Sequence, residues 1–173
     1  MGGYSCVGTA DQRVVTGGIW GTGTISDGCV SRFRVATWTV RAVPSRRPPE
    51  VIIAGRGCLS AWKELRAYAE KRGATVVCSM GGIGAVHSDC WHYLGMLGHT
   101  GDRLANQAVA AAKTIIALGT RLDMRQTGTA PDLWADKYII MVNEDCRELE
   151  HARVPVSEKW LMSVERWLRV QDA

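Results

Sequence analysis

The amino-acid sequence predicts an α/β fold in three layers, with helices covering both faces of a parallel sheet. From residue 50 onward, short apolar runs alternate with amphipathic segments of helical period. Two of these runs end at a glycine, as is typical of strands buried on both faces. The chain has 173 residues, of which 46% are hydrophobic and 22% charged, so it is long enough for one domain with its own core and is not wholly disordered.

Residues 1–45 differ in composition from the rest and are predicted to be a Gly-rich N-terminal extension to a domain over residues 46–173. Residues 1–30 contain eight glycines, and neither Lys nor Glu occurs before residue 45. The β-like pieces of this extension are Arg13–Thr16 and Val30–Val43, although residues 35–43 also fit a short helix. The run Pro44–Pro49 ends the extension, because two adjacent prolines permit neither a helix nor a strand ladder.

The first half of the domain is predicted as strand, helix and strand. Val51–Ala54 is a short apolar run of the kind expected for a buried parallel strand. Ser60 is the predicted N-cap of a helix that ends at Gly73. The apolar face of this helix comprises Ala61, Leu65, Tyr68 and Ala69. Ala74–Cys78 is the second buried strand, and a Gly-rich stretch and the apolar segment Tyr93–Leu97 follow it.

The second half continues the alternation. Asp102 is the predicted N-cap of a helix. The inward face of this helix comprises Leu104, Ala105, Ala108, Val109 and Ala112. Thr114–Leu118 and Lys137–Val142 are the next strands, with a short fifth strand at Arg153–Val156, and Ser157 begins a last helix. The apolar face of the last helix comprises Trp160, Leu161, Val164 and Leu168.

Charge and cysteine usage restrict the partners and the compartment. Lys and Arg number 21 against 17 Asp and Glu, and the resulting charge of +4 is too mild to indicate a nucleic-acid partner. No apolar run approaches the roughly 20 residues needed to cross a bilayer, and the first residues lack a signal-peptide pattern. The six cysteines include no Cys-x-x-Cys pair, which favours reduced thiols. We therefore expect a cytoplasmic protein with neither a nucleic-acid nor a membrane partner.

Ligands of open parallel sheets bind beyond the carboxyl ends of the strands, so the residues after each strand are the candidate site. Gly55 and Gly57 would let a phosphate approach the backbone, with free N–H groups supplied by the following helix. A tight turn is the alternative for these glycines. A standard NAD site is not indicated. Ser60 stands at the position of the third glycine of the dinucleotide-binding motif, and the second strand, which Ser79 and Met80 follow, does not end in an Asp or Glu.

Polar residues also follow the third and fourth strands. Arg121 and Arg125 suit bidentate recognition of a diphosphate, the alternative being a solvated loop with ordinary surface pairing. Asn143 and Asp145 offer acceptors for ribose hydroxyls, and a helix-capping turn fits them equally well.

No catalytic residue and no metal site are predicted. The sequence has neither a Gly-x-Ser-x-Gly elbow nor a Walker loop, and it offers no nucleophile–base pair. The one metal-like cluster comprises His87, Cys90, His92 and His99. Its spacing matches no zinc pattern, so packing of a loop is the favoured interpretation.

Four blocks of residues carry a resemblance to a known family. They are Val51–Gly57, Met80–Val86, Leu94–Gly101 with Ala105-Asn106, and Ala117–Gly128. In order and spacing they resemble the central domain of thiamine-diphosphate-dependent enzymes, most closely acetohydroxyacid (acetolactate) synthase. The resemblance implies a Rossmann-like parallel sheet of about six strands, of the DHS-like NAD/FAD-binding type.

The resemblance also implies a ligand. In the synthases this domain holds FAD in a structural role, and relatives bind ADP or another nucleotide, or none. The positions implied for FAD or an ADP-type nucleotide are Gly55, Arg56, Gly57, Ser79, Met80, Gly98, His99, Thr100, Gly101, Gly119, Arg121, Asp123, Arg125, Asn143 and Asp145. His99-Thr100-Gly101 stands where the synthases have Met-His-Gly, and Asn143 stands where they have Asp. The residues implied for the adenine–diphosphate half of the FAD site therefore match those of the synthases better than the residues implied for the flavin half.

Thiamine-diphosphate chemistry in this family needs two further domains, one with an activating Glu and one with a Gly-Asp-Gly motif. The nearest approach to that motif is Gly101–Arg103, so we expect no thiamine diphosphate and no catalysis on this chain alone. Three functions stay open: a nucleotide-binding module, a scaffold or interaction protein with an empty pocket, and one part of a split thiamine-diphosphate-dependent lyase or carboligase. The last would work as a homodimer or with partner chains that carry the missing domains.

Overall fold

The computed structural model describes residues 14–15, 40–41, 50–130 and 132–172. The chain divides into two units, Met1–Arg46 and Arg47–Ala173. In the first unit, β1 (Val14–Val15) pairs antiparallel with β2 (Val40–Arg41), so the short helix considered for residues 35–43 is wrong at Val40 and Arg41. The remainder of the predictions for the N-terminal extension lies outside the described residues, and the domain boundary near residue 45 stays a prediction.

The second unit contains a six-stranded parallel sheet, which confirms the predicted fold class. Its strands are β3 (Glu50–Ala54), β4 (Thr75–Cys78), β5 (Tyr93–Met96), β6 (Thr114–Leu118), β7 (Tyr138–Asn143) and β8 (Glu158–Leu161). They lie in the order β5-β4-β3-β6-β7-β8, which is the doubly wound order of a Rossmann-type sheet. The strand order reverses between β3 and β6, and Ala54 of β3 aligns with Leu118 of β6 at their carboxyl ends.

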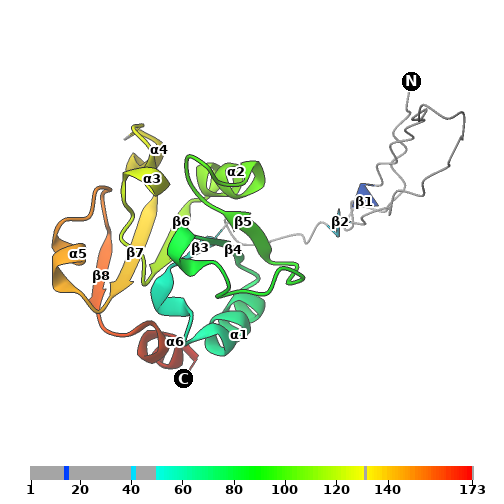
Figure 1. Cartoon of the computed structure of the whole chain (residues 1–173), viewed down its shortest axis with the longest axis horizontal. Coiled ribbons are helices and arrows are strands. Elements are labelled where there is room, and N and C mark those ends of the chain that lie inside the picture. Colours follow the sequence, from blue (N-terminus) through cyan, green and yellow to red (C-terminus); the bar gives the residue numbers. More distant parts are fainter. Residues whose placement is uncertain (1–13, 16–39, 42–49, 131, 173) are drawn as a thin grey trace, which may run out of the picture. The chain divides into compact units, whose positions relative to one another are not determined.

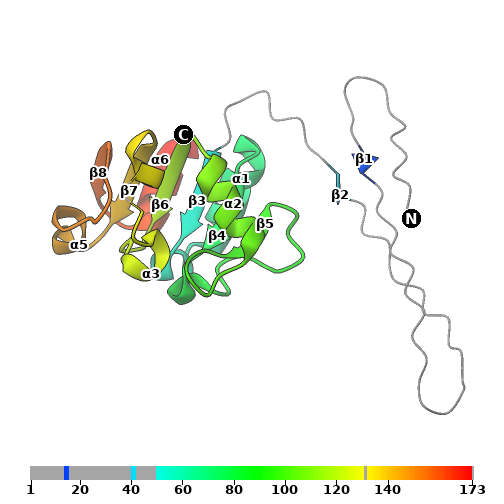
Figure 2. The same ribbon diagram turned by 90° about the horizontal axis from the view of Figure 1, so that it is seen from above.

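Helices cover both faces of this sheet (Figures 1 and 2). They are α1 (Trp62–Arg72), α2 (Arg103–Ala111), α3 (Met124–Thr127), α4 (Asp132–Ala135), α5 (Cys146–Glu150) and α6 (Val164–Asp172), with the 3-10 turns η1 (Arg56–Cys58) and η2 (Met80–Gly82). The helices α1 and α6 lie on one face, and α2, α3 and α4 lie on the other. Strand β3 divides its side chains between the two cores, since Ile52 packs toward α1 and α6 whereas Val51 and Ile53 pack toward α2.

The predicted face of α1 is confirmed, but its predicted N-cap is wrong. The buried residues are Ala61, Leu65, Tyr68 and Ala69. Gly73 ends the helix in the left-handed conformation, with φ of 64°. Ala61 occupies the N-cap position instead of Ser60, because the 3-10 turn before it continues until the Ala61 N–H bonds to the carbonyl of Cys58. The helix therefore begins one residue later than predicted from the cap.

The helix α2 begins after the predicted N-cap residue, but the side chain of that residue does not cap the helix. Asp102 occupies the N-cap position, but its carboxylate accepts a hydrogen bond from the Met96 N–H at 2.7 Å and caps no N–H of the helix. Ala105, Val109 and Ala112 are buried as predicted. Leu104 is exposed, so the inward face is narrower than the apolar pattern indicates.

The C-terminal elements are displaced relative to the prediction. The predicted strand at Arg153–Val156 does not form, and the last strand is β8 instead. Ser157 was predicted to cap a helix, but its N–H donates a hydrogen bond to the Ile139 carbonyl of β7. β8 is an edge strand with one covered face, and Leu161 is 60% exposed. The last helix, α6, begins only at Val164, which with Trp167 and Leu168 forms its buried face. A half-covered strand with few apolar residues gives a weak sequence pattern.

The four described cysteines, Cys58, Cys78, Cys90 and Cys146, are free thiols, and the first two are buried. Cys58 donates to the Leu118 carbonyl, and burial raises the pKa of its thiol to about 12. Within the described ranges, no helix is long and apolar enough to span a bilayer.

His92 is expected to make the stability of this domain depend on pH. This residue is 3% exposed, and among the described residues its Nε2 atom has no hydrogen-bond partner. Burial lowers the pKa of this imidazole below its usual 6.5. The unfolded chain therefore binds a proton that the folded chain resists, and the free energy of unfolding should fall as pH drops through about 6.5.

Urea unfolding of wild type and His92→Phe at pH 7.5 and pH 5.5 measures this effect. The wild type should lose more stability on acidification than His92→Phe, whereas the matched variant His151→Gln, at an exposed histidine, should behave as wild type. An equal loss in wild type and His92→Phe would contradict the assignment.

Candidate functional site

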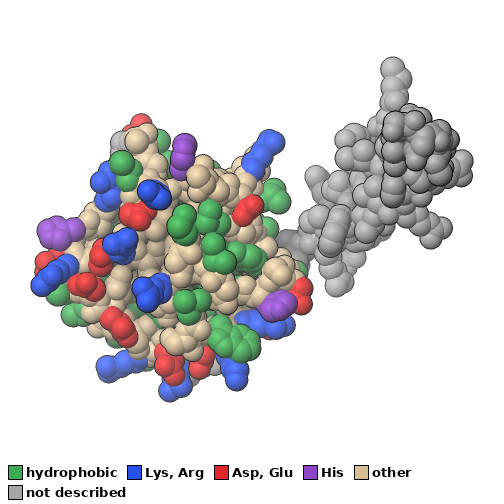
Figure 3. Space-filling model, in the orientation of Figure 1, with side chains coloured by type: hydrophobic (Ala, Val, Ile, Leu, Met, Phe, Trp, Pro, Cys, Tyr) green, Lys and Arg blue, Asp and Glu red, His purple; other side chains and the backbone are tan. Residues whose placement is uncertain are grey.

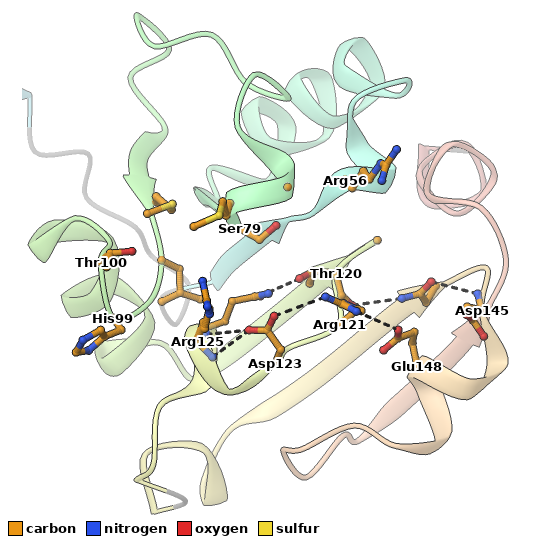
Figure 4. Close-up of a pocket in the computed structure, with 17 residues that line it drawn as sticks. Arg56, Ser79, His99, Thr100, Thr120, Arg121, Asp123, Arg125, Asp145 and Glu148 are labelled. Carbon is orange, nitrogen blue, oxygen red and sulfur yellow. Dashed lines mark hydrogen bonds and ion pairs between the residues drawn. The ribbon is translucent and has the colours of Figure 1, made fainter.

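A cavity of about 1130 Å³ lies beyond the carboxyl ends of β3 to β7, at the point where the strand order reverses. All but four of the predicted site residues line it (Figure 4). They are Arg56, Ser79, Met80, His99, Thr100, Gly119, Arg121, Asp123, Arg125, Asn143 and Asp145. The fold thus brings together residues from five separate strand ends.

The other four predicted residues, Gly55, Gly57, Gly98 and Gly101, do not line this cavity but let the loops around it pack. A Cβ atom on Gly55 would lie 2.1 Å from the Gly119 carbonyl oxygen, and one on Gly101 would lie 2.3 Å from the Met96 carbonyl oxygen. These glycines therefore permit close approach of backbone to backbone.

Three N–H groups of the turn after β3 are used within the protein and are not free for a phosphate. The Gly55 N–H donates to the Leu118 carbonyl at 2.8 Å, and the Gly57 N–H donates to the Gly119 carbonyl at 3.3 Å. The Cys58 N–H turns back to the Gly55 carbonyl at 3.0 Å. The tight-turn alternative describes this segment, because the hydrogen bonds that were to hold a phosphate instead join the turn to the end of β6.

The loop after β6 is held in an unusual conformation. Leu122 has a φ of 51°, rare for a residue with a side chain, and its side chain is fully buried. Burial of that side chain offsets the backbone strain and fixes the loop. Asp123 then caps α3 by accepting hydrogen bonds from the N–H groups of Arg125 and Gln126, at 3.0 and 3.2 Å. The two arginines are thereby presented from a constrained segment.

The arginines at the cavity differ in their pairing. Arg121 lies 3.9 Å from Asp123 and 3.8 Å from Glu148, and its side chain is 65% exposed, so these ion pairs are weak (Figure 4). In the described part of the chain no carboxylate lies within ion-pair distance of Arg125 or Arg56. Figure 4 shows Arg125 reaching into the cavity, whereas Arg56 points away from Arg121 and Arg125.

Ser79 faces Arg125 from the opposite wall of the cavity (Figure 4). The residue as a whole is 5% exposed, and among the described residues its hydroxyl has no hydrogen-bond partner. The hydroxyl oxygen is not one of the fully buried unpartnered atoms, so it is accessible from the cavity. The Ser79 hydroxyl is therefore available to a molecule in the cavity.

The loop after β5 is positioned by side chains that were not predicted as site residues. The Asn106 carboxamide accepts from the Gly98 N–H and donates to the Gly98 carbonyl, each at 3.0 Å. The His99 N–H donates to the Arg125 carbonyl at 2.9 Å, which joins this loop to α3. His99 and Thr100 are thus held at the cavity rim by α2 and α3.

The end of β7 forms a helix-capping turn. The Asn143 carboxamide donates to the Thr120 carbonyl at 3.3 Å and accepts from the Asp145 N–H at 3.1 Å. Asp145 caps α5 by accepting from the Arg147 N–H at 2.9 Å. The capping alternative for these residues is therefore confirmed, and a role in holding ribose stays a prediction.

Several cavity residues were missed by sequence reasoning. They are Gly81, Met96, Leu97, Thr120, Gln126 and Glu148. All but Met96 and Glu148 adjoin residues that were predicted, so that adjacency in the sequence was the available signal. Glu148 lies within α5, where the pattern of a short helix gives no indication of which side chain faces the cavity.

The surface around the cavity is divided by character. Figure 3 shows apolar side chains over the β3 to β5 side and side chains of both charges over β7, β8 and α5. The apolar lining residues Met80, Met96 and Leu97 belong to the first side, and Asp145 and Glu148 belong to the second.

Among the described residues, no group of three or more His, Cys, Asp or Glu side chains could hold a metal ion.

Comparison with known proteins identifies the family. Residues 43–165 match the family described as thiamine pyrophosphate enzyme, central domain. The chain belongs to this family. This central domain is 37% identical over 111 residues to acetolactate synthase 1, chloroplastic, of Zea mays, a match that covers 64% of the chain. It is 32% identical over 109 residues to the acetolactate synthase isozyme 2 large subunit of Escherichia coli strain K12, covering 63% of the chain.

The central domain spans 17% and 20% of the lengths of these two synthases. The same fold occurs in the X-ray structure of a candidate thiamin diphosphate-dependent enzyme isolated from Mycobacterium smegmatis, with a TM-score of 0.55 and 20% identity. That match covers 71% of this chain and 24% of the other. The resemblance to central domains close to acetolactate synthase is thus confirmed.

Proposed function

We propose that this central domain binds an ADP-containing nucleotide, FAD or ADP, in a structural and non-catalytic role. The observation that carries the proposal is the cavity at the strand reversal, where Arg125 and the unpartnered Ser79 hydroxyl face each other. Guanidinium and hydroxyl groups are the donors that a diphosphate requires. Parallel sheets of this order bind their ligands at this position.

The residues present fit such a ligand in size and in character. The cavity volume of about 1130 Å³ slightly exceeds the usual range for small-molecule sites, roughly 300–1,000 Å³, so a nucleotide or a dinucleotide can be accommodated. Met80, Met96 and Leu97 offer an apolar wall for a ring system. Bound FAD would act there as a structural element, and the protein's own groups would hold and orient it.

The carboxylates of the cavity support a binding role. Asp123 and Asp145 cap α3 and α5, and Glu148 pairs with Arg121. Asp123 and Asp145 therefore serve to build the site. As sequence reasoning indicated, we expect a cytoplasmic module without nucleic-acid or membrane partners.

Titration calorimetry with ADP, and desalting after incubation with FAD followed by an absorbance scan, test the proposal. We expect a micromolar dissociation constant, and at ligand about 100-fold above that constant a stabilisation of about 2.7 kcal/mol in the thermal unfolding transition. If neither ADP, FAD nor NAD gives heat, retention or a thermal shift, the nucleotide role is wrong and the scaffold alternative gains support.

A second candidate function is supported by the lengths of the relatives. Because the chain spans about a fifth of the synthases it matches, we propose as the alternative that it forms one part of a thiamine-diphosphate-dependent lyase or carboligase. It would then act as a homodimer or with partner chains. Co-purification from the native source and a carboligation assay of the recovered assembly test this alternative.

A further inference from the structure

We propose that Glu148 determines the nucleotide specificity of the cavity, by accepting hydrogen bonds from the vicinal hydroxyls of a ribose and by excluding nucleotides that carry a phosphate on that ribose. This inference rests on the proposed nucleotide-binding function. Glu148 lies in α5 at the cavity wall and is absent from the residues that the sequence predicted.

The charges of the cavity are separated in space. The lining of the cavity contains three arginines and three carboxylates, so their formal charges cancel. They are Arg56, Arg121, Arg125, Asp123, Asp145 and Glu148. In Figure 4, Asp145 and Glu148 lie together beyond Arg121, whereas Arg125 and Ser79 lie on the other side. A ligand whose phosphates lie near Arg125 would therefore place a neutral part near Glu148. A ribose with two hydroxyl donors has that chemistry.

Among the carboxylates of this cavity, Glu148 is the one whose oxygens accept no hydrogen bond from a neighbouring N–H group. Asp123 and Asp145 each use a carboxylate oxygen as a helix cap, and the Asn143 oxygen accepts from the Asp145 N–H. In the described part of the chain the Glu148 carboxylate accepts no hydrogen bond, and its one ion pair, to Arg121, is 3.8 Å long. Two free oxygens on one carboxylate match two adjacent hydroxyls.

The opposite wall of the cavity offers a hydrogen-bonding group for the other end of the ligand. The Ser79 hydroxyl, without a partner in the described part of the chain and accessible from the cavity, lines that wall. A ligand that satisfied Ser79 and Arg125 with a diphosphate would extend its sugar across the cavity toward α5. A further phosphate on that sugar would then meet the Glu148 carboxylate, and like charges repel.

Calorimetry with ADP, 2′-deoxy-ADP, ADP-ribose and 2′-phospho-ADP-ribose tests the inference on wild type and Glu148→Gln. Wild type should bind ADP about tenfold more tightly than 2′-deoxy-ADP, and Glu148→Gln should reduce that ratio to about two. The variant should also narrow the preference for ADP-ribose over 2′-phospho-ADP-ribose at least tenfold. Glu150→Gln, at an exposed carboxylate of the same helix, should keep both wild-type ratios.

The outcomes separate this inference from the proposed function. If wild type binds ADP but both ratios are unchanged in Glu148→Gln, the assignment of Glu148 is wrong and nucleotide binding stands. If wild type binds none of the four probes, the assignment of Glu148 is wrong, and if it also binds neither FAD nor NAD, the proposed function is wrong too. A circular dichroism melt of Glu148→Gln verifies that the folded state survives the change, as expected for a partly exposed side chain.

Discussion

Replacing Gly55 with alanine should destabilise the domain by at least about 3 kcal/mol, or prevent folding altogether. The added Cβ would lie 2.1 Å from the Gly119 carbonyl oxygen and 2.6 Å from the Thr120 nitrogen, and both of these atoms are backbone. Relief would require the end of β3 to separate from the end of β6, which would break the hydrogen bond from the Gly55 N–H to the Leu118 carbonyl. Urea unfolding monitored by circular dichroism measures the loss.

Gly81→Ala is the matched control. Its Cβ would have ordinary van der Waals contact, 3.5 Å from the Arg56 Cβ, so its stability should be within about 1 kcal/mol of wild type. A Gly55→Ala variant as stable as Gly81→Ala would show that the two strand ends are not packed as described. Because Gly119 and Thr120 line the cavity, a folded Gly55→Ala variant should also bind nucleotide more weakly.

Replacing Arg125 with alanine should weaken ADP binding by roughly 10- to 100-fold, since a hydrogen bond to a charged group contributes about 1.5–3 kcal/mol. Arg125 is expected to carry more of the affinity than Arg121, because Arg121 already lies near two carboxylates whereas Arg125 has none within ion-pair distance in the described part of the chain. Calorimetry with ADP at fixed ionic strength measures the difference.

Arg103→Ala, at an exposed arginine in the first turn of α2 outside the cavity, controls for the change in overall charge and should bind ADP as wild type does. Arg121→Ala should lose less affinity than Arg125→Ala. An Arg125→Ala variant with wild-type affinity would place the diphosphate elsewhere and refute the site as described.

Among the strands, those that the sequence predicted best are buried on both faces. Val51–Ala54 and Thr114–Leu118 are continuous apolar runs, and their positions in the sheet agree with the prediction because such runs have few alternatives to burial. The prediction failed at β8, an edge strand in which exposed and half-buried residues alternate. Trp160 is half-buried and Leu161 is exposed, so the apolar residues do not alternate with polar ones as in a half-buried strand, and the last helix was predicted too early.

The sequence predicted which residues belong to the site better than it predicted what each of them does there. Most of the predicted residues do line the cavity, because the carboxyl ends of parallel strands share one edge of the sheet. Gly55 and Gly57 were expected to approach a phosphate but instead approach Gly119. A glycine indicates that something comes close to the backbone and does not indicate what it is.

The sequence by itself determined the parallel α/β fold, the family and the strand ends at which the cavity forms, since these follow from local apolar runs and short motifs. The tertiary structure decided which polar groups are left over. Asn143 reaches Thr120, and Arg121 reaches Glu148, across separate loops of the folded chain. Whether an acceptor is free for a ligand depends on such long-range partners, which no local pattern encodes, and for that reason Glu148 emerged only from the folded chain.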